Sequence, residues 1–200
     1  MVLGAALLCA ALTLFTMNER ENTQAQEVAE EVLPQLVEQI EEITLQETEP
    51  DLTEDLLIPE ELLTEEQVKM PEVEVKGNRY IGYLSMPTLG LKLPIMSSWS
   101  YPKLKISPCR YSGSIRGKDL VLLAHNYKSH FGPIRRLKTG DPVTFTDMEG
   151  NVTRFAVAGR DVLPPTAVEE ITGSGFPLTL FTCTYGGKSR VTVYCDLIEE

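Results

Sequence analysis

A hairpin near the C-terminal end constrains the fold of this chain more than any other stretch. Residues 177–185 are rich in β-branched and aromatic side chains, Gly186-Gly187 is a two-residue turn signal, and residues 188–195 form a second such run. If the two residues that flank the glycines pair with each other, the antiparallel register places Cys183 opposite Arg190. Because directly opposite residues share a face of a sheet, the pattern predicts a thiol and a guanidinium side by side.

This pair suits nucleophilic catalysis. Arg190, which is always charged, would stabilise a thiolate or donate hydrogen bonds to an oxyanion on the acyl group that Cys183 attacks. The alternative is a small buried cysteine and a surface arginine that are merely neighbours. The hairpin alone leaves both interpretations open.

A cysteine nucleophile needs a proton carrier, and the chain has two histidines. His125 follows the continuous apolar run 119–124 and precedes a polar loop, where functional residues are common. His130 lies within that loop, at a position typical of a surface histidine. We therefore predict that His125 is the partner of Cys183.

The net charge of −11 is distributed unevenly along the chain. Residues 18–76 contain 19 acidic and three basic side chains, a net charge of −16, whereas residues 77–200 contain 15 basic and 10 acidic side chains, a net charge of +5. The second segment has the ordinary size of a domain with one core. It has no stripe of clustered Lys and Arg with interleaved aromatic residues, so we expect no nucleic-acid partner.

The N-terminal 76 residues divide into two parts. Residues 1–17 contain no charged side chain and predict an uncleaved single-pass membrane anchor, with a cleaved signal peptide as the alternative. Residues 18–76 predict an acidic, partly helical stalk, with a second short helix over residues 60–68. This segment is either a solvated spacer or a regulatory segment that packs on the basic domain.

One apolar stripe runs along the stalk at helical spacing, and Pro34 is expected to kink or divide that helix. The stripe consists of Val28, Val32, Leu36, Ile40 and Ile43.

From residue 77 onward, short strands alternate with turns, which predicts an all-β barrel or sandwich. Strands are expected over residues 80–86, 89–95, 104–106, 119–124, 141–147 and 152–162, before the hairpin. Residues 164–172 predict one or two helical turns. We accordingly assign residues 1–17 to the anchor, 18–76 to the stalk and 77–200 to the catalytic domain.

Three cysteines besides Cys183 are present. Cys9 lies in the apolar head, and Cys109 and Cys195 are either a disulfide pair in an extracytoplasmic domain or two separate thiols. Strand alternation points Cys195 into the interior, away from the face of Cys183. No CxxC motif or histidine-rich cluster is present, so we predict no metal and no cofactor.

In their order and spacing these motifs resemble the sortases, the cysteine transpeptidases of bacterial cell surfaces. Residues 179–183, Thr-Leu-Phe-Thr-Cys, match the T-L-x-T-C signature, and Arg190 stands on the following strand. Residues 123–126, Leu-Ala-His-Asn, are similar to the strand of the catalytic histidine. Further similar stretches cover residues 81–87, 93–95, 111–114 and 137–141, with Phe131. The resemblance covers most of residues 77–200 and implies an eight-stranded sortase barrel with short helices.

The resemblance also implies a reaction. Cys183 would attack a carbonyl in an LPxTG-like sorting signal, His125 would protonate the leaving amine and Arg190 would stabilise the oxyanion. Thr182 would contact the substrate. The partners would be surface proteins with a C-terminal sorting signal and an amine acceptor such as a peptidoglycan precursor or a pilin lysine. The catalytic domain would lie outside the membrane of a Gram-positive-type bacterium.

Two features distinguish this chain from typical sortases. Only six residues separate Cys183 from Arg190, a shorter connection than most sortases have. The stretch 126–131 is similar to class B and the compact chain to class D, so the class stays open. Thr182-Cys183-Thr184 does not supply the Ser-His-Gly-Cys context of an L,D-transpeptidase. The main alternative function is a non-catalytic extracytoplasmic β-barrel binding module on a membrane stalk.

Overall fold

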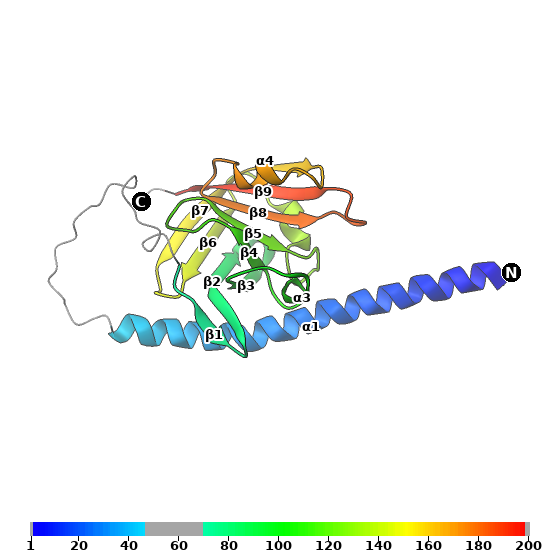
Figure 1. Cartoon of the computed structure of the whole chain (residues 1–200), viewed down its shortest axis with the longest axis horizontal. Helices are drawn as coiled ribbons and strands as arrows, with labels where there is room; N and C mark the ends of the chain where they lie inside the picture. The colour runs from blue at the N-terminus through cyan, green and yellow to red at the C-terminus, as the bar shows by residue number, and fades with distance from the viewer. Residues whose placement is uncertain (1, 47–69, 199–200) are drawn as a thin grey trace.

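The computed structural model describes residues 2–46 and 70–198 of the chain. Figure 1 shows a strand-rich body, with the long helix α1 running along one side of it. In chain order the elements are α1 (Val2–Gln46), β1 (Val73–Val75), β2 (Asn78–Met86), η2 (Pro87–Leu89), β3 (Leu91–Met96), α3 (Tyr101–Leu104), β4 (Cys109–Ser112), β5 (Leu120–Ala124), η3 (Gly132–Arg136), β6 (Pro142–Asp147), β7 (Val152–Leu163), α4 (Val168–Thr172), β8 (Leu178–Cys183) and β9 (Arg190–Leu197).

Within the described residues, eight strands close into a barrel. Neighbouring strands follow the order β2-β3-β4-β5-β8-β9-β7-β6, and β6 pairs back onto β2. The short strand β1 pairs with the first residues of β2, and β6 pairs with the residues of β2 that follow them. Gly82 lies at this junction with a φ of +138°, where a Cβ atom would come within 2.0 Å of the carbonyl oxygen of Thr146. The predicted all-β barrel with short helices is confirmed.

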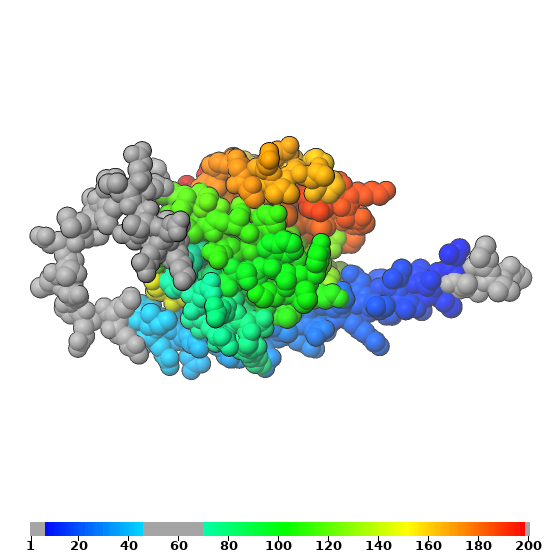
Figure 2. Space-filling model, viewed as in Figure 1, coloured from blue at the N-terminus to red at the C-terminus, as the bar shows by residue number. Residues whose placement is uncertain are grey.

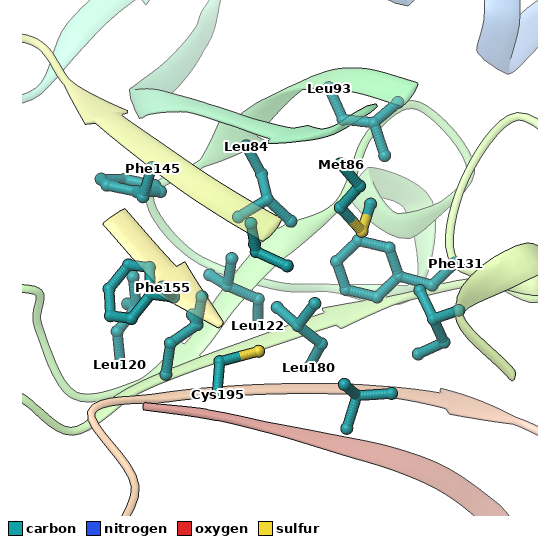
Figure 3. Packing of buried hydrophobic residues seen from close by; sticks show 14 of the residues in the cluster. Leu84, Met86, Leu93, Leu120, Leu122, Phe131, Phe145, Phe155, Leu180 and Cys195 are labelled. Atoms are coloured by element: carbon teal, nitrogen blue, oxygen red, sulfur yellow. The ribbon is translucent and has the colours of Figure 1, made fainter. Parts of the chain in front are cut away.

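Large apolar side chains fill the barrel interior (Figure 3). Phe145 of β6 and Phe155 of β7 lie in one cluster with Leu122 of β5 and Leu180 of β8. Cys195 points into the same cluster, as strand alternation predicted, and burial raises the pKa of its thiol to about 12. This closed apolar interior is the rigid support on which the strand ends are held.

The cysteines form no disulfide. Cys109 on β4 is buried in a second cluster, separate from that of Cys195, and burial raises the pKa of its thiol to about 12 as well. All four cysteines are free. Of the two alternatives that the sequence left open, the pair of separate thiols is therefore the one found.

Helix α1 packs on the outside of the barrel through the predicted apolar stripe. Val32, Leu36 and Ile40 are buried in one cluster with Tyr80 and Met96. Although proline removes an amide donor from a helix, α1 runs unbroken through position 34, so the predicted division is absent. Val32 and Leu36 of the stripe are buried on either side of that position. The acidic segment is a docked helix rather than a solvated spacer over its described length.

The N-terminal part of α1 extends beyond the barrel (Figure 2). Its exposed large apolar side chains are Leu7, Leu8, Leu12, Leu14, Phe15 and Met17. Among the described residues, no helix combines the length and the apolar composition needed to cross a membrane. The membrane anchor expected over residues 1–17 stays a prediction. The helix expected over residues 60–68 lies outside the described residues.

One strand prediction was wrong. Residue 104 is the last residue of the short helix α3, and residues 105–106 form the turn that follows it. Ser100 caps this helix by accepting a hydrogen bond from the Lys103 amide at 3.3 Å. Pro102 in the first turn pre-sets the helical φ. The short strands β1 and β4, of three and four residues, were not among the predicted strands. The helical turn expected within residues 164–172 is found as α4.

Candidate active site

Cys183, His125 and Arg190 come together where three neighbouring strands meet one edge of the barrel. Strands β5 and β8 run parallel, and their last pair is Ala124 with Thr182. Cys183 is the last residue of β8 and His125 directly follows β5, so the two residues lie at adjacent strand ends. Strand β9 runs antiparallel to β8 and begins with Arg190 opposite Cys183, as the sequence predicted. All three side chains line one cavity of about 220 Å³.

The turn between β8 and β9 differs from the predicted two-glycine turn. The Gly187 amide donates to the carbonyl oxygen of Thr184 at 2.8 Å, which centres the tight turn on Tyr185 and Gly186. The amide of Thr184 then donates to the carbonyl oxygen of Ser189 at 2.9 Å. Gly186 and Gly187 have φ values of +81° and +71°, a region that favours glycine. The register of the strands is as predicted, but the turn is shifted by one residue.

Arg190 is anchored to this turn. One terminal nitrogen of its guanidinium, Nη1, donates to the carbonyl oxygens of Gly187 and Ser189 at 3.1 and 3.2 Å. A guanidinium has five N–H donors, so this anchoring leaves donors for a ligand in the cavity. The half-buried side chain therefore presents a fixed cation beside Cys183.

His125 is half-buried at the end of β5. Burial lowers the pKa of its imidazole below the ordinary value, the carboxylate of Glu21 raises that pKa, and Lys105 lowers it. Because burial is the largest of these effects, the environment favours the neutral imidazole. A neutral ring can accept the proton of a thiol.

Comparison with known proteins identifies the family. Residues 84–198 match the family model of the sortase domain. The chain belongs to the sortase family. This confirms the resemblance drawn from its motifs.

Solved sortase structures share the fold. Sortase C1 from Streptococcus suis is 25% identical with a TM-score of 0.53, and the match covers 60% of this chain and 74% of that one. Sortase C from Clostridium perfringens SM101 is 21% identical with a TM-score of 0.54, over 94% of this chain and 99% of that one. A Clostridium perfringens sortase D5 transpeptidase is 18% identical with a TM-score of 0.54, over 69% and 91%. No curated protein matches the sequence.

Thr182 of this sortase lies on the opposite face of β8 from Cys183, because side chains alternate along a strand. It is buried, and its hydroxyl donates to the carbonyl oxygen of Ala124 at 2.8 Å. This hydrogen bond joins β8 to β5 at the residues that directly precede Cys183 and His125. The predicted substrate contact of Thr182 stays a prediction.

An aromatic wall that sequence reasoning missed lines the cavity of the sortase. The ring of Trp99 stacks on Tyr111 with centroids 5.7 Å apart, and Tyr111 meets Phe181 edge-on at 5.2 Å. Trp99 is the only tryptophan of the chain, and it is 41% exposed. The feature of the sequence that could have indicated this wall is an aromatic residue, Trp99, in a loop between strands. The wall offers apolar surface next to Cys183.

His130 was expected at the surface and is instead fully buried. Burial lowers the pKa of its imidazole to about 4. Its ring lies 5.4 Å from that of Tyr127, which in turn lies 4.9 Å from the ring of His125. His130 is thus a neutral support behind the loop that follows His125.

The part of the chain that the structure describes contains no group of three or more His, Cys, Asp or Glu side chains that would hold a metal ion.

Proposed function

We propose that this sortase is a cysteine transpeptidase that cleaves a sorting signal and transfers the acyl group to an amine. The observation that carries the proposal is the meeting of Cys183, His125 and Arg190 in one cavity, at the ends of three neighbouring strands. A nucleophile, a proton carrier and a fixed cation are the groups that acyl transfer requires.

In the proposed first half-reaction, the sulfur of Cys183 attacks the carbonyl carbon of the scissile peptide bond while His125 accepts the thiol proton. Arg190 donates hydrogen bonds to the oxyanion of the tetrahedral intermediate. Collapse of the intermediate breaks the C–N bond, and His125 gives its proton to the leaving amine. A thioester on Cys183 remains.

In the second half-reaction, an acceptor amine attacks the thioester carbonyl. The C–S bond breaks, the product amide forms, and the proton that the amine loses returns to sulfur through His125. Hydrolysis is the competing reaction, so the site must favour the amine over water.

Two cavities reach Cys183 from different sides and support two substrate positions. One contains the aromatic wall of Trp99, Tyr111 and Phe181, where we place the apolar part of the sorting signal. The other is lined by Arg135 and Arg160, where we place the acceptor. These two cations favour an acceptor that carries a carboxylate near its amine.

Trapping the thioester tests this function. The full chain would be incubated with a panel of LPxTG-type peptides, and intact mass would report an acyl adduct. We expect an adduct that is absent in Cys183→Ala and present in Cys9→Ser, which removes the exposed thiol of α1. An adduct that survives Cys183→Ala contradicts the assignment. Failure of the whole panel would favour the non-catalytic binding module.

Substrates of this kind are displayed at the cell surface. We therefore propose an extracytoplasmic location for the catalytic domain. Protease treatment of intact cells, followed by detection of residues 77–200, would check it, because a cytoplasmic domain would survive that treatment.

A further inference from the structure

Helix α1 reaches the loop that follows the catalytic histidine. One carboxylate oxygen of Glu21, Oε2, accepts the hydroxyl hydrogen of Tyr127 at 2.7 Å. The other, Oε1, lies 2.8 Å from the ammonium nitrogen of Lys105. Glu21 is therefore bound from two sides, by residues that lie 84 and 106 positions away in the sequence.

The neighbouring residue of α1 holds the same loop. The side-chain oxygen Oδ1 of Asn22 accepts a hydrogen bond from the backbone amide of Ser129 at 3.0 Å and lies 3.1 Å from its hydroxyl. The hydroxyl of Ser129 also donates to the backbone oxygen of Asn22 at 3.2 Å. The loop is thus fixed to α1 at two points, two residues apart.

Tyr127 connects this attachment to His125. Its side chain is only 6% exposed, and its ring lies against the imidazole of His125 with centroids 4.9 Å apart. The backbone closes the loop, because the Phe131 amide donates to the carbonyl oxygen of His125 at 3.1 Å. With its hydroxyl bound to Glu21, Tyr127 limits the rotation of the imidazole. General acid–base catalysis depends on such fixed geometry.

The negative charge of Glu21 also affects His125, through the pKa of its imidazole. Hydrogen bonds from Lys105 and then from Tyr127 lower the pKa of Glu21, so its carboxylate stays ionised at neutral pH. That negative charge raises the pKa of His125 against the lowering effects of burial and Lys105. The titratable or charged groups around His125 are Glu21 from α1, Lys105 after α3, Tyr127 and His130 from its own loop, and Cys183 and Arg190 from the strand ends.

We propose that Glu21, acting through Tyr127, is a positioning residue for His125, so that α1 is a working part of the active site. The proposal rests on the function proposed above, in which His125 carries the proton. The contacts place Glu21 outside the reacting atoms, and its effect reaches them through the aromatic ring and through its charge.

An NMR titration of the full chain tests the electrostatic part without any substrate. Glu21→Gln keeps the size and an acceptor oxygen but removes the charge. Glu19→Gln is the matched control, because Glu19 pairs with Lys128 of the same loop at 3.4 Å. The chain has only two histidines, and burial lowers the pKa of His130 to about 4. We expect His125 to titrate at lower pH in Glu21→Gln and unchanged in Glu19→Gln. Equal titration of His125 in Glu21→Gln and the parent chain would overturn the proposal.

Kinetics test the geometric part. We expect Glu21→Ala and Tyr127→Leu to lower kcat about tenfold with KM unchanged, a fraction of the 10²–10⁴-fold that acid–base catalysis supplies. Tyr127→Phe keeps the ring but loses the hydroxyl that binds Glu21, so it should lower kcat about as much as Glu21→Ala does. A loss of thermal stability with unchanged kcat would assign Glu21 a purely structural role and refute the proposal. An inactive parent chain would instead refute the function proposed above, while the titration of His125 still reports on Glu21.

Discussion

Cys183 and Arg190 are fixed by the backbone pairing of β8 with β9, whereas the loop that follows His125 is held from outside by side chains of α1. The first arrangement is built on strands whose inner faces fill the barrel with apolar side chains. The second depends on a few polar contacts at a half-exposed surface. Backbone pairing resists salt and surface substitution, while partly exposed ion pairs are screened by salt. The site therefore joins a rigid half to an adjustable half.

The largest expected effect tests the rigid half. Arg190→Gln should slow thioester formation roughly 10³-fold, because one fixed donor for the oxyanion is lost. Lys188→Gln is the matched control, since Lys188 is an exposed cation of the same turn and should change the rate less than about twofold. Single-turnover acylation measures both rates. A similar loss in the two variants would mean that general positive charge, rather than the position of Arg190, supports the reaction.

The next prediction asks whether α1 belongs to the same cooperative unit as the barrel. Leu36→Ala should lower the free energy of unfolding by about 3 kcal/mol, because Leu36 is fully buried between α1 and the sheet. Leu12 lies near the other end of the same helix and is 67% exposed, so Leu12→Ala should change this free energy by less than about 0.5 kcal/mol. Urea unfolding followed by circular dichroism measures both values. Two separate transitions would show that α1 unfolds independently of the barrel.

The same contrast explains what could be read from the sequence. Strand periodicity located β5, β8 and β9, and the pairing rule placed Cys183 opposite Arg190, because both depend on residues close together in the chain. The contact of Glu21 with Tyr127 spans 106 residues and carries no local pattern. Glu21 is one of many acidic residues on α1, so its role could not be distinguished before the contacts of the helix with the barrel were known.

Burial was the property hardest to predict for the loop. His130 lies in a polar stretch, so its sequence context indicates exposure, yet the side chain is fully enclosed. The turn at Tyr185-Gly186 shows a similar limit, because three neighbouring residues offer two glycines and therefore more than one turn position. Local sequence defined the register of the hairpin but not the position of its turn.

The pH dependence of the free energy of unfolding tests His130, which is buried behind the loop that follows His125. Burial lowers the pKa of His130 from 6.5 to about 4, so between these pH values the unfolded chain binds a proton that the folded chain does not. Stability should be full above pH 6.5 and fall by up to about 3 kcal/mol as the pH decreases to 4. His130→Phe removes this contribution and should show a shallower loss, since all other groups titrate in both proteins. Parallel curves would contradict the burial of an uncharged imidazole.

The smallest effect concerns Thr182, which belongs to the rigid half. Thr182→Val keeps the shape of the side chain but removes the hydroxyl that donates to the carbonyl oxygen of Ala124. We expect the free energy of unfolding to fall by about 1 kcal/mol, because a buried acceptor loses its donor. Thr139→Val is the matched control, since its hydroxyl donates to the carbonyl oxygen of Ala158 at an exposed position, and its loss should be smaller. If Thr182 instead binds substrate, as its sequence motif implies, KM would rise with little change in stability. Measuring KM and the free energy of unfolding in the same two variants shows whether the Thr182 hydroxyl stabilises the pairing of β5 with β8 or contacts the peptide.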